Sequence, residues 1–233
     1  MHTEEVGESA KQQRKVKAVN VYEAPLRLWH WVNALSIFTF MLTGYFIGRP
    51  VHSVSGDATE NFLLGYIRFV HFAAAHVFAL AFLGRIYWAF AGNAHARQLF
   101  LLPVFRPRWW GEVLYELKWY LFLVGYPKKY IGHNPLARFM MFVFAVVGAG
   151  YMISSGFALY SEGAGARHWS DVLFGWVIPF AGGSMQLHSW HRMGLWVTLL
   201  FIMVHVYAAI REDIVSRQSI LATMISGWRT FKD

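Results

Sequence analysis

The chain has no cysteine. Without a thiolate it cannot hold an iron–sulfur cluster, attach haem through a C-x-x-C-H motif or form a disulfide within the chain. If this protein moves electrons, a cofactor held by other residues must carry them.

Charge is scarce as well. Charged residues make up 15% of the 233 residues, against 56% hydrophobic and 18% aromatic residues. This composition is too apolar for an ordinary soluble domain. Four runs lack Asp, Glu, Lys and Arg: Leu28–Gly48, Phe69–Gly84, Phe139–Ser161 and Met193–Ile210. The second run continues in apolar residues past Arg85 to Phe90.

A membrane-spanning helix needs roughly 20 apolar residues, and lipid leaves no partner for an unpaired backbone. The sequence therefore predicts an all-α integral membrane protein with four transmembrane helices. The run 172–191 is also uncharged, but Pro179, Gly182 and Gly183 interrupt it. We interpret Val172–Phe180 as a surface or re-entrant piece. Trp119–Tyr126 is too short to cross; with a tryptophan pair before it and a lysine pair after it, we expect an interfacial helix.

Positive charge is distributed unevenly between the connections. Five Lys or Arg lie in 1–27, six in 92–135 and four in 211–233, whereas 49–64 and 160–187 carry one each. The positive-inside rule places both termini and the 92–135 connection in the cytoplasm. This bias explains the net charge of +8, so we expect the lipid bilayer, and no nucleic acid, as the partner of these charges.

The polar N-terminal arm has no apolar core of a cleavable signal, so we expect the first spanning helix to serve as the insertion signal. We divide the chain into a flexible cytoplasmic arm (1–20), a transmembrane four-helix domain (21–215) and a cytoplasmic tail (216–233).

Two of the 11 histidines, His191 and His205, lie 14 residues apart in one apolar run. On a helix, 14 steps return to within ~40° of the same face, ~21 Å farther along. One helix could therefore supply an axial ligand to each of two stacked haems. By depth, His71 pairs with His191 near the outer face and His30 with His205 near the inner face, and each pair joins two helices.

Arginines accompany these histidines. Arg27 and Arg68 each precede a histidine by three residues, Arg192 follows His191, and Arg85 lies 14 residues after His71. Haem propionates are carboxylates, which arginine binds with a bidentate fork. All four are candidates for propionate binding; the alternative is that they extend to lipid phosphates.

Other histidines compete for these roles. His188 could replace His191, although its 17-residue separation from His205 turns it ~100° off the shared face. His76 is better explained as a hydrogen-bonded core residue than as a ligand. His2, His52, His95 and His168 lie in polar connections and are expected to be solvated.

The segment 130–138 opens the third span, with Pro135 at the first helical position and Asn134 as the N-cap. Capping alone could explain Asn134. His133 could bind a quinone carbonyl and relay its proton, so His133 and Asn134 are candidates for a quinone site.

Two long runs, Arg27–Gly44 (RLWHWVNALSIFTFMLTG) and His188–His205 (HSWHRMGLWVTLLFIMVH), resemble the signature stretches of the cytochrome b subunit of membrane-bound nickel–iron uptake hydrogenases. The resemblance extends over nearly the whole chain after residue 20, through 44–56, 65–72, 85–93, 132–135, 156–162 and 205–214.

The resemblance implies a role in a hydrogen:quinone oxidoreductase of the bacterial cytoplasmic (inner) membrane. Similar proteins anchor the hydrogenase small and large subunits on the outer face, take electrons from the small subunit's iron–sulfur chain and pass them through haem b to quinone. The related cytochromes of formate dehydrogenases hold two haems, each with one fourth-helix histidine. We expect the connections 49–64 and 160–187 to dock the partner, which performs the hydrogen chemistry.

Three alternatives remain open: a cytochrome subunit of another dehydrogenase such as formate dehydrogenase, a haem-poor membrane anchor, and a proton or solute transporter. Against the transporter, the chain shows no internal inverted repeat and no Asp or Glu relay within its spans.

Overall fold

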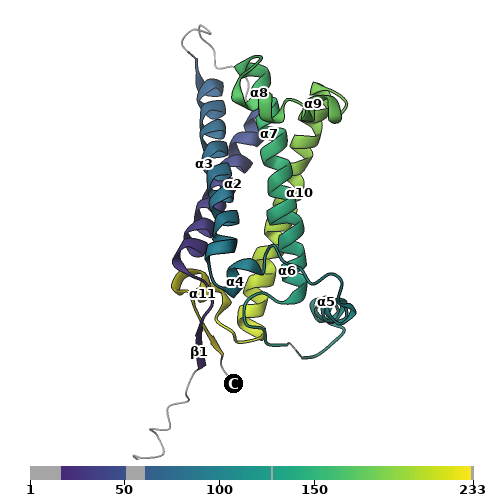
Figure 1. Cartoon of the computed structure of the whole chain (residues 1–233). Helices are drawn as coiled ribbons and strands as arrows, with labels where there is room; N and C mark the ends of the chain where they lie inside the picture. The colour runs from purple at the N-terminus through teal and green to yellow at the C-terminus, as the bar shows by residue number, and fades with distance from the viewer. Residues whose placement is uncertain (1–16, 51–60, 127, 232–233) are drawn as a thin grey trace, which may run out of the picture.

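The computed structural model describes residues 17–50, 61–126 and 128–231. Within these residues four helices are long and apolar enough to cross a membrane, which confirms the predicted number of spans. Each is longer than its uncharged run: α2 (Ala24–Gly48), α3 (Leu63–Ala91), the third span (Pro135–Ala164) and α10 (Ser184–Val215). They run side by side along the length of the molecule (Figure 1).

The surface of these helices is the reverse of a soluble protein. Large apolar side chains such as Leu80 and Leu200 are more than 60% exposed, whereas the buried residues of α2 include Asn33 and Ser36. Lipid solvates apolar side chains, so small and polar residues can be placed between the helices. This distribution, with the length and composition of the helices, makes the chain an integral membrane protein.

The third span is composed of three pieces: α6 (Pro135–Met141), a π-helical turn η1 (Phe142–Val147) and α7 (Gly148–Ala164). It begins as predicted, because the Asn134 side chain accepts a hydrogen bond from the Ala137 backbone N–H at 2.7 Å and Pro135 follows it. The π turn widens the helix inside the membrane, a distortion that often occurs at functional sites.

The four spans form two close pairs, with α2 packed along α3 and α7 along α10. Contacts of α2 with α10 and of α3 with α7 join the pairs. Residues on α2 and α3 therefore face residues on α10 across the seam between the two pairs.

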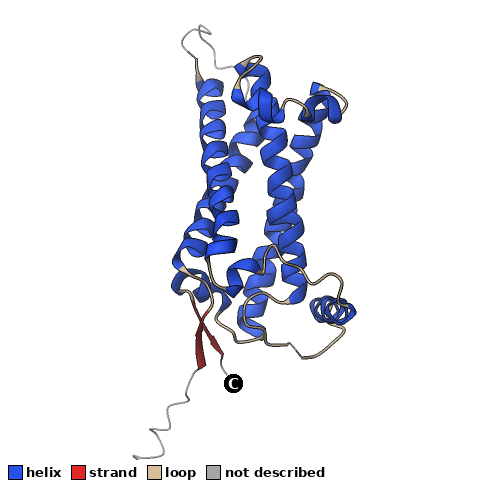
Figure 2. Ribbon diagram, in the orientation of Figure 1, coloured by secondary structure: helices blue, strands red, loops and turns tan. Residues whose placement is uncertain are grey.

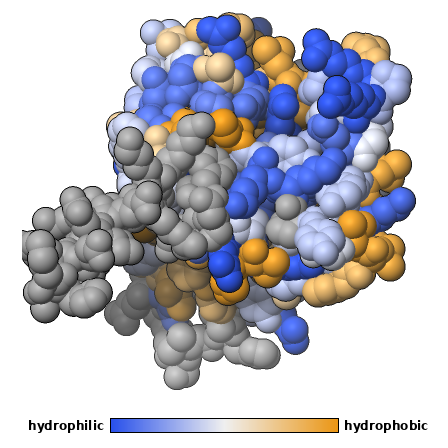
Figure 3. Space-filling view, turned by 90° about the horizontal axis from the view of Figure 1, so that it is seen from below, coloured by the Kyte–Doolittle hydropathy of each residue, from blue (hydrophilic) through white to orange (hydrophobic). Residues whose placement is uncertain are grey.

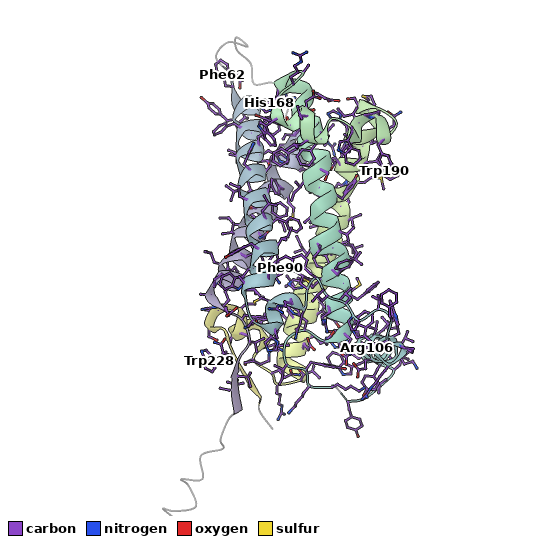
Figure 4. The ribbon with its side chains drawn as sticks, in the orientation of Figure 1. Phe62, Phe90, Arg106, His168, Trp190 and Trp228 are labelled. Carbon is purple, nitrogen blue, oxygen red and sulfur yellow. The ribbon has the colours of Figure 1, made fainter. Side chains whose placement is uncertain are left out.

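One end of the bundle carries two short helices, α8 (Trp169–Phe174) and α9 (Val177–Phe180), as Figure 1 shows. These short helices do not form a fifth span. They agree with the interpretation of Val172–Phe180 as a surface or re-entrant piece. Aromatic contacts hold α8 in place, since Trp169 packs edge-on against Phe157 and His76. Figure 4 places His168 at this end, where its Nδ1 accepts a hydrogen bond from the Ser170 hydroxyl at 2.8 Å, so it is not simply solvated.

The opposite end, called here the strand end, carries the two described strands (Figure 2). Strand β1 (Lys17–Asn20) pairs antiparallel with β2 (Trp228–Phe231), with Lys17 opposite Phe231. The helices α4 (Ala94–Arg97) and α11 (Ile220–Ser226) lie beside them. The last four residues of the predicted flexible arm are thus ordered by the tail; the rest of the arm lies outside the described residues.

The prediction of an interfacial helix was wrong in its position. The helix, α5, covers Pro107–Tyr120, and residues 121–126 are turns. Pro107 suits the first turn, and the chain leaves the helix at Phe122, which has a φ of +61°. Arg211 fixes this end by donating to the carbonyl oxygens of Tyr120 and Trp119 at 2.7 and 2.9 Å.

Candidate functional site

At the α8/α9 end, two histidines from different helices are held in the same way. The Nδ1 atom of His71 lies 2.8 Å from the Thr43 hydroxyl, and that of His191 lies 2.7 Å from the Ser155 hydroxyl. Each hydroxyl donates its own proton to the backbone carbonyl four residues earlier. The imidazole Nδ1–H must then be the donor, which leaves Nε2 as the bare nitrogen for a metal.

A glycine follows each of these hydroxyl residues. A Cβ at Gly44 would lie 3.5 Å from the His71 ring, and one at Gly156 would lie 3.2 Å from the His191 ring. The absence of a side chain therefore leaves space beside both imidazoles. Sequence reasoning missed Thr43 and Ser155; a hydroxyl residue followed by glycine inside an apolar span is the signal that could have found them.

The structure brings the histidines together in the pairs that spacing suggested. His71 lies close enough to His191, and His205 close enough to His30, for a charge on one ring to affect the other; His188 is likewise near His191, and His133 near His205. The first two pairs each join α2 or α3 to α10. Ligation of a haem iron by these four histidines stays a prediction.

The strand-end pair is arranged differently. The Nδ1 atom of His30 is buried and has no hydrogen-bond partner among the described residues. His205 stacks on Phe201 with ring centroids 5.8 Å apart, and Phe201 stacks on Phe144 at 4.8 Å. Because Phe144 lies in the π turn, the distorted part of the third span helps set the orientation of the His205 ring.

Arg85 is the arginine best placed for an anionic group. It is 3% exposed, lies against the rings of Trp29 and Phe100, and donates from Nη2 to the Ala96 carbonyl oxygen at 2.6 Å. Its Nε and Nη1 atoms and the Trp29 indole nitrogen are buried without partners among the described residues. A buried cation without a counter-charge is costly, so this site fits a propionate carboxylate.

The other three arginines differ from Arg85. Arg68 and Arg192 are exposed at the α8/α9 end, and Arg192 lies over Gly48, where an added Cβ would be 3.3 Å from its Nε. At this end either a haem propionate or a lipid phosphate could accept hydrogen bonds from Arg68 and Arg192. Arg27 instead donates to the Ile225 carbonyl oxygen, so the structure uses it to hold the tail.

The competing histidines have other partners. His76 donates from Nδ1 to the Phe72 carbonyl oxygen at 2.8 Å and packs among aromatic rings, as expected of a core residue. His188 is exposed, with its Nδ1 3.0 Å from the Ser184 carbonyl oxygen. Of the polar-connection histidines, His95 is bonded to Gln98 at 3.0 Å, whereas His2 and His52 lie outside the described residues.

His133, one of the two quinone candidates, lies 3.0 Å from the Tyr22 hydroxyl through Nδ1. Burial, followed by the nearby Arg229 cation, lowers the pKa of His133 to about 3. Burial raises the pKa of Tyr22 to about 12. Both groups are therefore neutral at pH 7, and His133 can bind a carbonyl only as a neutral donor.

Asn134, the other candidate, is already occupied. Its Oδ1 caps α6, and its Nδ2 donates to Glu212 Oε1 at 3.0 Å. These contacts favour a structural role for Asn134, in agreement with the alternative that helix capping alone explains this residue.

These features define a class of protein. It is an integral membrane protein with four spanning helices, and between the helices lie two pairs of histidines whose members come from different helices. Imidazole pairs from separate helices suit a cofactor metal that needs two axial ligands. At one end the two Nε2 atoms are available to a metal, and at the other end two guanidinium nitrogens of Arg85 lack a partner among the described residues; both features fit a haem with anionic edge groups.

Comparison with known proteins agrees with this class. The sequence profile of the family described as prokaryotic cytochrome b561 matches residues 21–227. The chain belongs to this family and is a b-type cytochrome, so haem b is its implied cofactor.

Curated relatives cover nearly the whole chain. A probable Ni/Fe-hydrogenase B-type cytochrome subunit of Azotobacter vinelandii is 60% identical over 98% of this chain and 95% of its own length. Proteins of that name from Cupriavidus necator, and a hydrogenase 1 counterpart from Escherichia coli K12, are 56% and 47% identical. They cover 94% and 95% of this chain and 90% and 95% of their own lengths.

Proposed function

We propose that this chain is the membrane-anchoring electron-transfer subunit of a nickel–iron hydrogenase that faces the periplasm. It takes electrons from the iron–sulfur small subunit and delivers them to membrane quinone. One observation carries the proposal. His71 and His191 at one depth of the bundle, and His30 and His205 at another, each join α2 or α3 to α10. The names of the relatives support hydrogenase as the partner.

Two haems b fit the four histidines, with His71 and His191 at the outer site and His30 and His205 at the inner site. When bound, a haem with two imidazole ligands has no open position and carries single electrons. Thr43 and Ser155 orient the outer ligands and keep their Nε2 atoms free of protons. Arg85 supplies the cation for an inner propionate.

The positive-inside bias supports an inner-membrane orientation with both termini in the cytoplasm. The α8/α9 end then faces outward, and α8 and α9 form part of the docking surface for the hydrogenase small and large subunits. Residues 51–60 of the other expected docking connection lie outside the described residues. His133 lies at the opposite end, where it could donate to a quinone carbonyl.

The test is the haem-to-protein ratio, with a reduced-minus-oxidised spectrum, on gently solubilised complex. Two low-spin b haems per chain are expected. A folded chain without haem would refute the proposal and favour a structural anchor. Hydrogen-driven haem reduction in membranes that contain the hydrogenase then tests the partner, and formate-driven reduction alone would point to formate dehydrogenase.

A further inference from the structure

A buried carboxyl group in α5 has no place in the function proposed so far. Glu116 is 1% exposed, and its Oε1 atom has no hydrogen-bond partner among the described residues. It lies on the face of α5 that also buries Val113 and Trp119, and α5 packs against α6. A carboxyl group that is kept from water without a partner resists ionisation.

Five titratable or charged groups surround Glu116: Glu112 and Tyr120 on α5, Lys128 and Tyr130 in the connection after it, and Glu212 on α10. Burial raises the pKa of Glu116 to about 7; Glu212 on α10 and Glu112 on α5 add to the rise, while Tyr130 and Lys128 oppose it. A carboxyl group with a pKa near the working pH can both bind and release a proton.

One side of this group leads to solvent. Lys128 is exposed, with its ammonium group 4.2 Å from the centre of the Tyr115 ring. Glu112, one turn before Glu116, is half-buried. Arg106, at the start of the same helix, lies at the outer margin of the strand end (Figure 4), where hydrophilic side chains spread between apolar ones (Figure 3).

The other side leads into the bundle. The Tyr130 hydroxyl is buried and lies beside the Glu116 carboxyl group, whose negative charge it can stabilise. Glu212 interacts electrostatically with Glu116 and accepts a hydrogen bond from Asn134, the neighbour of His133. Glu212 also acts on Tyr22, whose hydroxyl is bonded to His133. Titratable groups that influence one another electrostatically therefore extend from the exposed edge of α5 to the quinone candidate, and hydrogen bonds join Glu212 to Asn134 and Tyr22 to His133.

We propose that Glu116 is the proton-loading carboxyl group of the strand end, taking protons from cytoplasmic solvent near Lys128 and passing them by way of Glu212 toward the quinone site at His133. This inference rests on the proposed function. Quinone becomes quinol by taking up two electrons, which hydrogen oxidation in the partner supplies, and two protons. Each transfer turns the Glu116 carboxylic acid into a carboxylate, which a proton from solvent restores, so two cycles serve one quinol.

The first test compares Glu116→Gln with Glu112→Gln in the complete complex. We expect the Glu116 variant to slow hydrogen-dependent quinone reduction by about a hundredfold, as for loss of a positioned proton donor. Hydrogen-driven haem reduction and activity with a soluble dye should stay unchanged. The Glu112 variant should stay within about twofold of the unaltered complex, because its carboxyl group is not sequestered from water. Glu116→Asp should restore part of the rate.

An unchanged quinone rate in the Glu116→Gln complex would overturn the inference. If hydrogen does not reduce the haems of the unaltered complex, the proposed function itself would be refuted. An infrared pH titration of the full chain separates the two, because it needs no turnover. A protonated-carboxyl band should disappear near pH 7 and be missing in Glu116→Gln. A spectrum without such a band at pH 6 would refute the role of Glu116.

Discussion

The two ends of the bundle satisfy their buried polar groups to different degrees. At the α8/α9 end, hydroxyls hold both histidine Nδ1 atoms. At the strand end lie all the buried side-chain polar atoms that lack a partner among the described residues. They belong to Arg27, Trp29, His30, Arg85, Gln98, Trp109, Glu116, Tyr130, Gln218 and Arg229.

The difference shows which site the protein prepares by itself. Hydrogen bonds within the protein hold the rings of His71 and His191, so the outer haem site proposed above would be preorganised. Unpaired buried groups cost free energy until a partner arrives. The unpaired groups at the strand end are therefore the ones that the proposed function pairs with a cofactor carboxylate, a quinone and protons.

The largest expected effect comes from removing a ligand. His191→Ala should eliminate the outer haem and stop hydrogen-dependent quinone reduction, while dye-linked hydrogenase activity survives, because electrons then have no entry into the chain. His205→Ala should instead eliminate the inner haem and leave the outer one reducible by hydrogen.

Haem content and low-spin signals of the two variants decide this prediction. Equal loss of both haems in each variant would show that the two ends depend on each other. Full quinone reduction in His191→Ala would refute the ligand assignment, and His188→Ala should have no such effect.

The next effect in size concerns Arg85. Arg85→Ala should lower the affinity of the inner haem by about a hundredfold, because a charge-assisted contact in a buried site contributes about 1.5–3 kcal/mol. Arg68→Ala, at an exposed position, should change haem binding by less than about threefold. Haem retention during dilution in detergent measures both, and equal retention would remove the distinction between buried and exposed arginines.

A smaller effect is expected at the outer site. Ser155→Ala removes the partner of His191 Nδ1 and should weaken outer haem binding by about tenfold, the lower part of the range for the partner of a metal-bound histidine. The haem should stay low-spin with a shifted reduction potential.

Ser154→Ala is the matched control, because the Ser154 hydroxyl bonds only the Gly150 carbonyl oxygen, at 2.7 Å, among the described residues. If both serine variants shift the outer potential alike, the hydroxyl of Ser155 has no special relation to the ligand.

The last prediction concerns stability instead of haem binding: a pH dependence at the strand end. His133 stays neutral in the folded chain down to about pH 3, whereas in the unfolded chain it takes a proton below about 6.5. The free energy of unfolding should therefore fall as the pH drops through this window, by at most about 1.4 kcal/mol per pH unit. The full contribution of His133 to the free energy of unfolding should be present above about pH 6.5.

Thermal unfolding in mild detergent, compared between the unaltered chain and His133→Gln, isolates this contribution because other carboxyl groups cancel in the difference. Glu116 should act in the opposite direction: its raised pKa gives stability that is lost as the pH rises from about 4.5 to about 7. Parallel curves for the two proteins would show that His133 is not kept neutral by the fold.

The predicted spans were confirmed because an apolar run of sufficient length can satisfy its backbone in lipid only as a helix. Pro135 and Asn134 were placed correctly for a similar reason, since capping depends on residues adjacent in sequence. The interfacial helix was misplaced because only its apolar run and the flanking tryptophan and lysine pairs located it, whereas the turns after Tyr120 depend on Arg211, about 90 residues away. The ordered arm was missed because β1 pairs with a strand from the other end of the chain.

The sequence by itself determined the membrane class, the number of helices and the helical face shared by His191 and His205, because periodicity and hydrophobicity are local properties. Only the tertiary structure decided which partner each side chain finds. In the folded chain Arg85 is buried whereas Arg68 is exposed, and Glu116 is shielded from solvent. Thr43 and Ser155 hydrogen-bond His71 and His191, and Asn134 hydrogen-bonds Glu212. The physical reason is that burial and hydrogen bonding depend on contacts between helices, which no single segment contains.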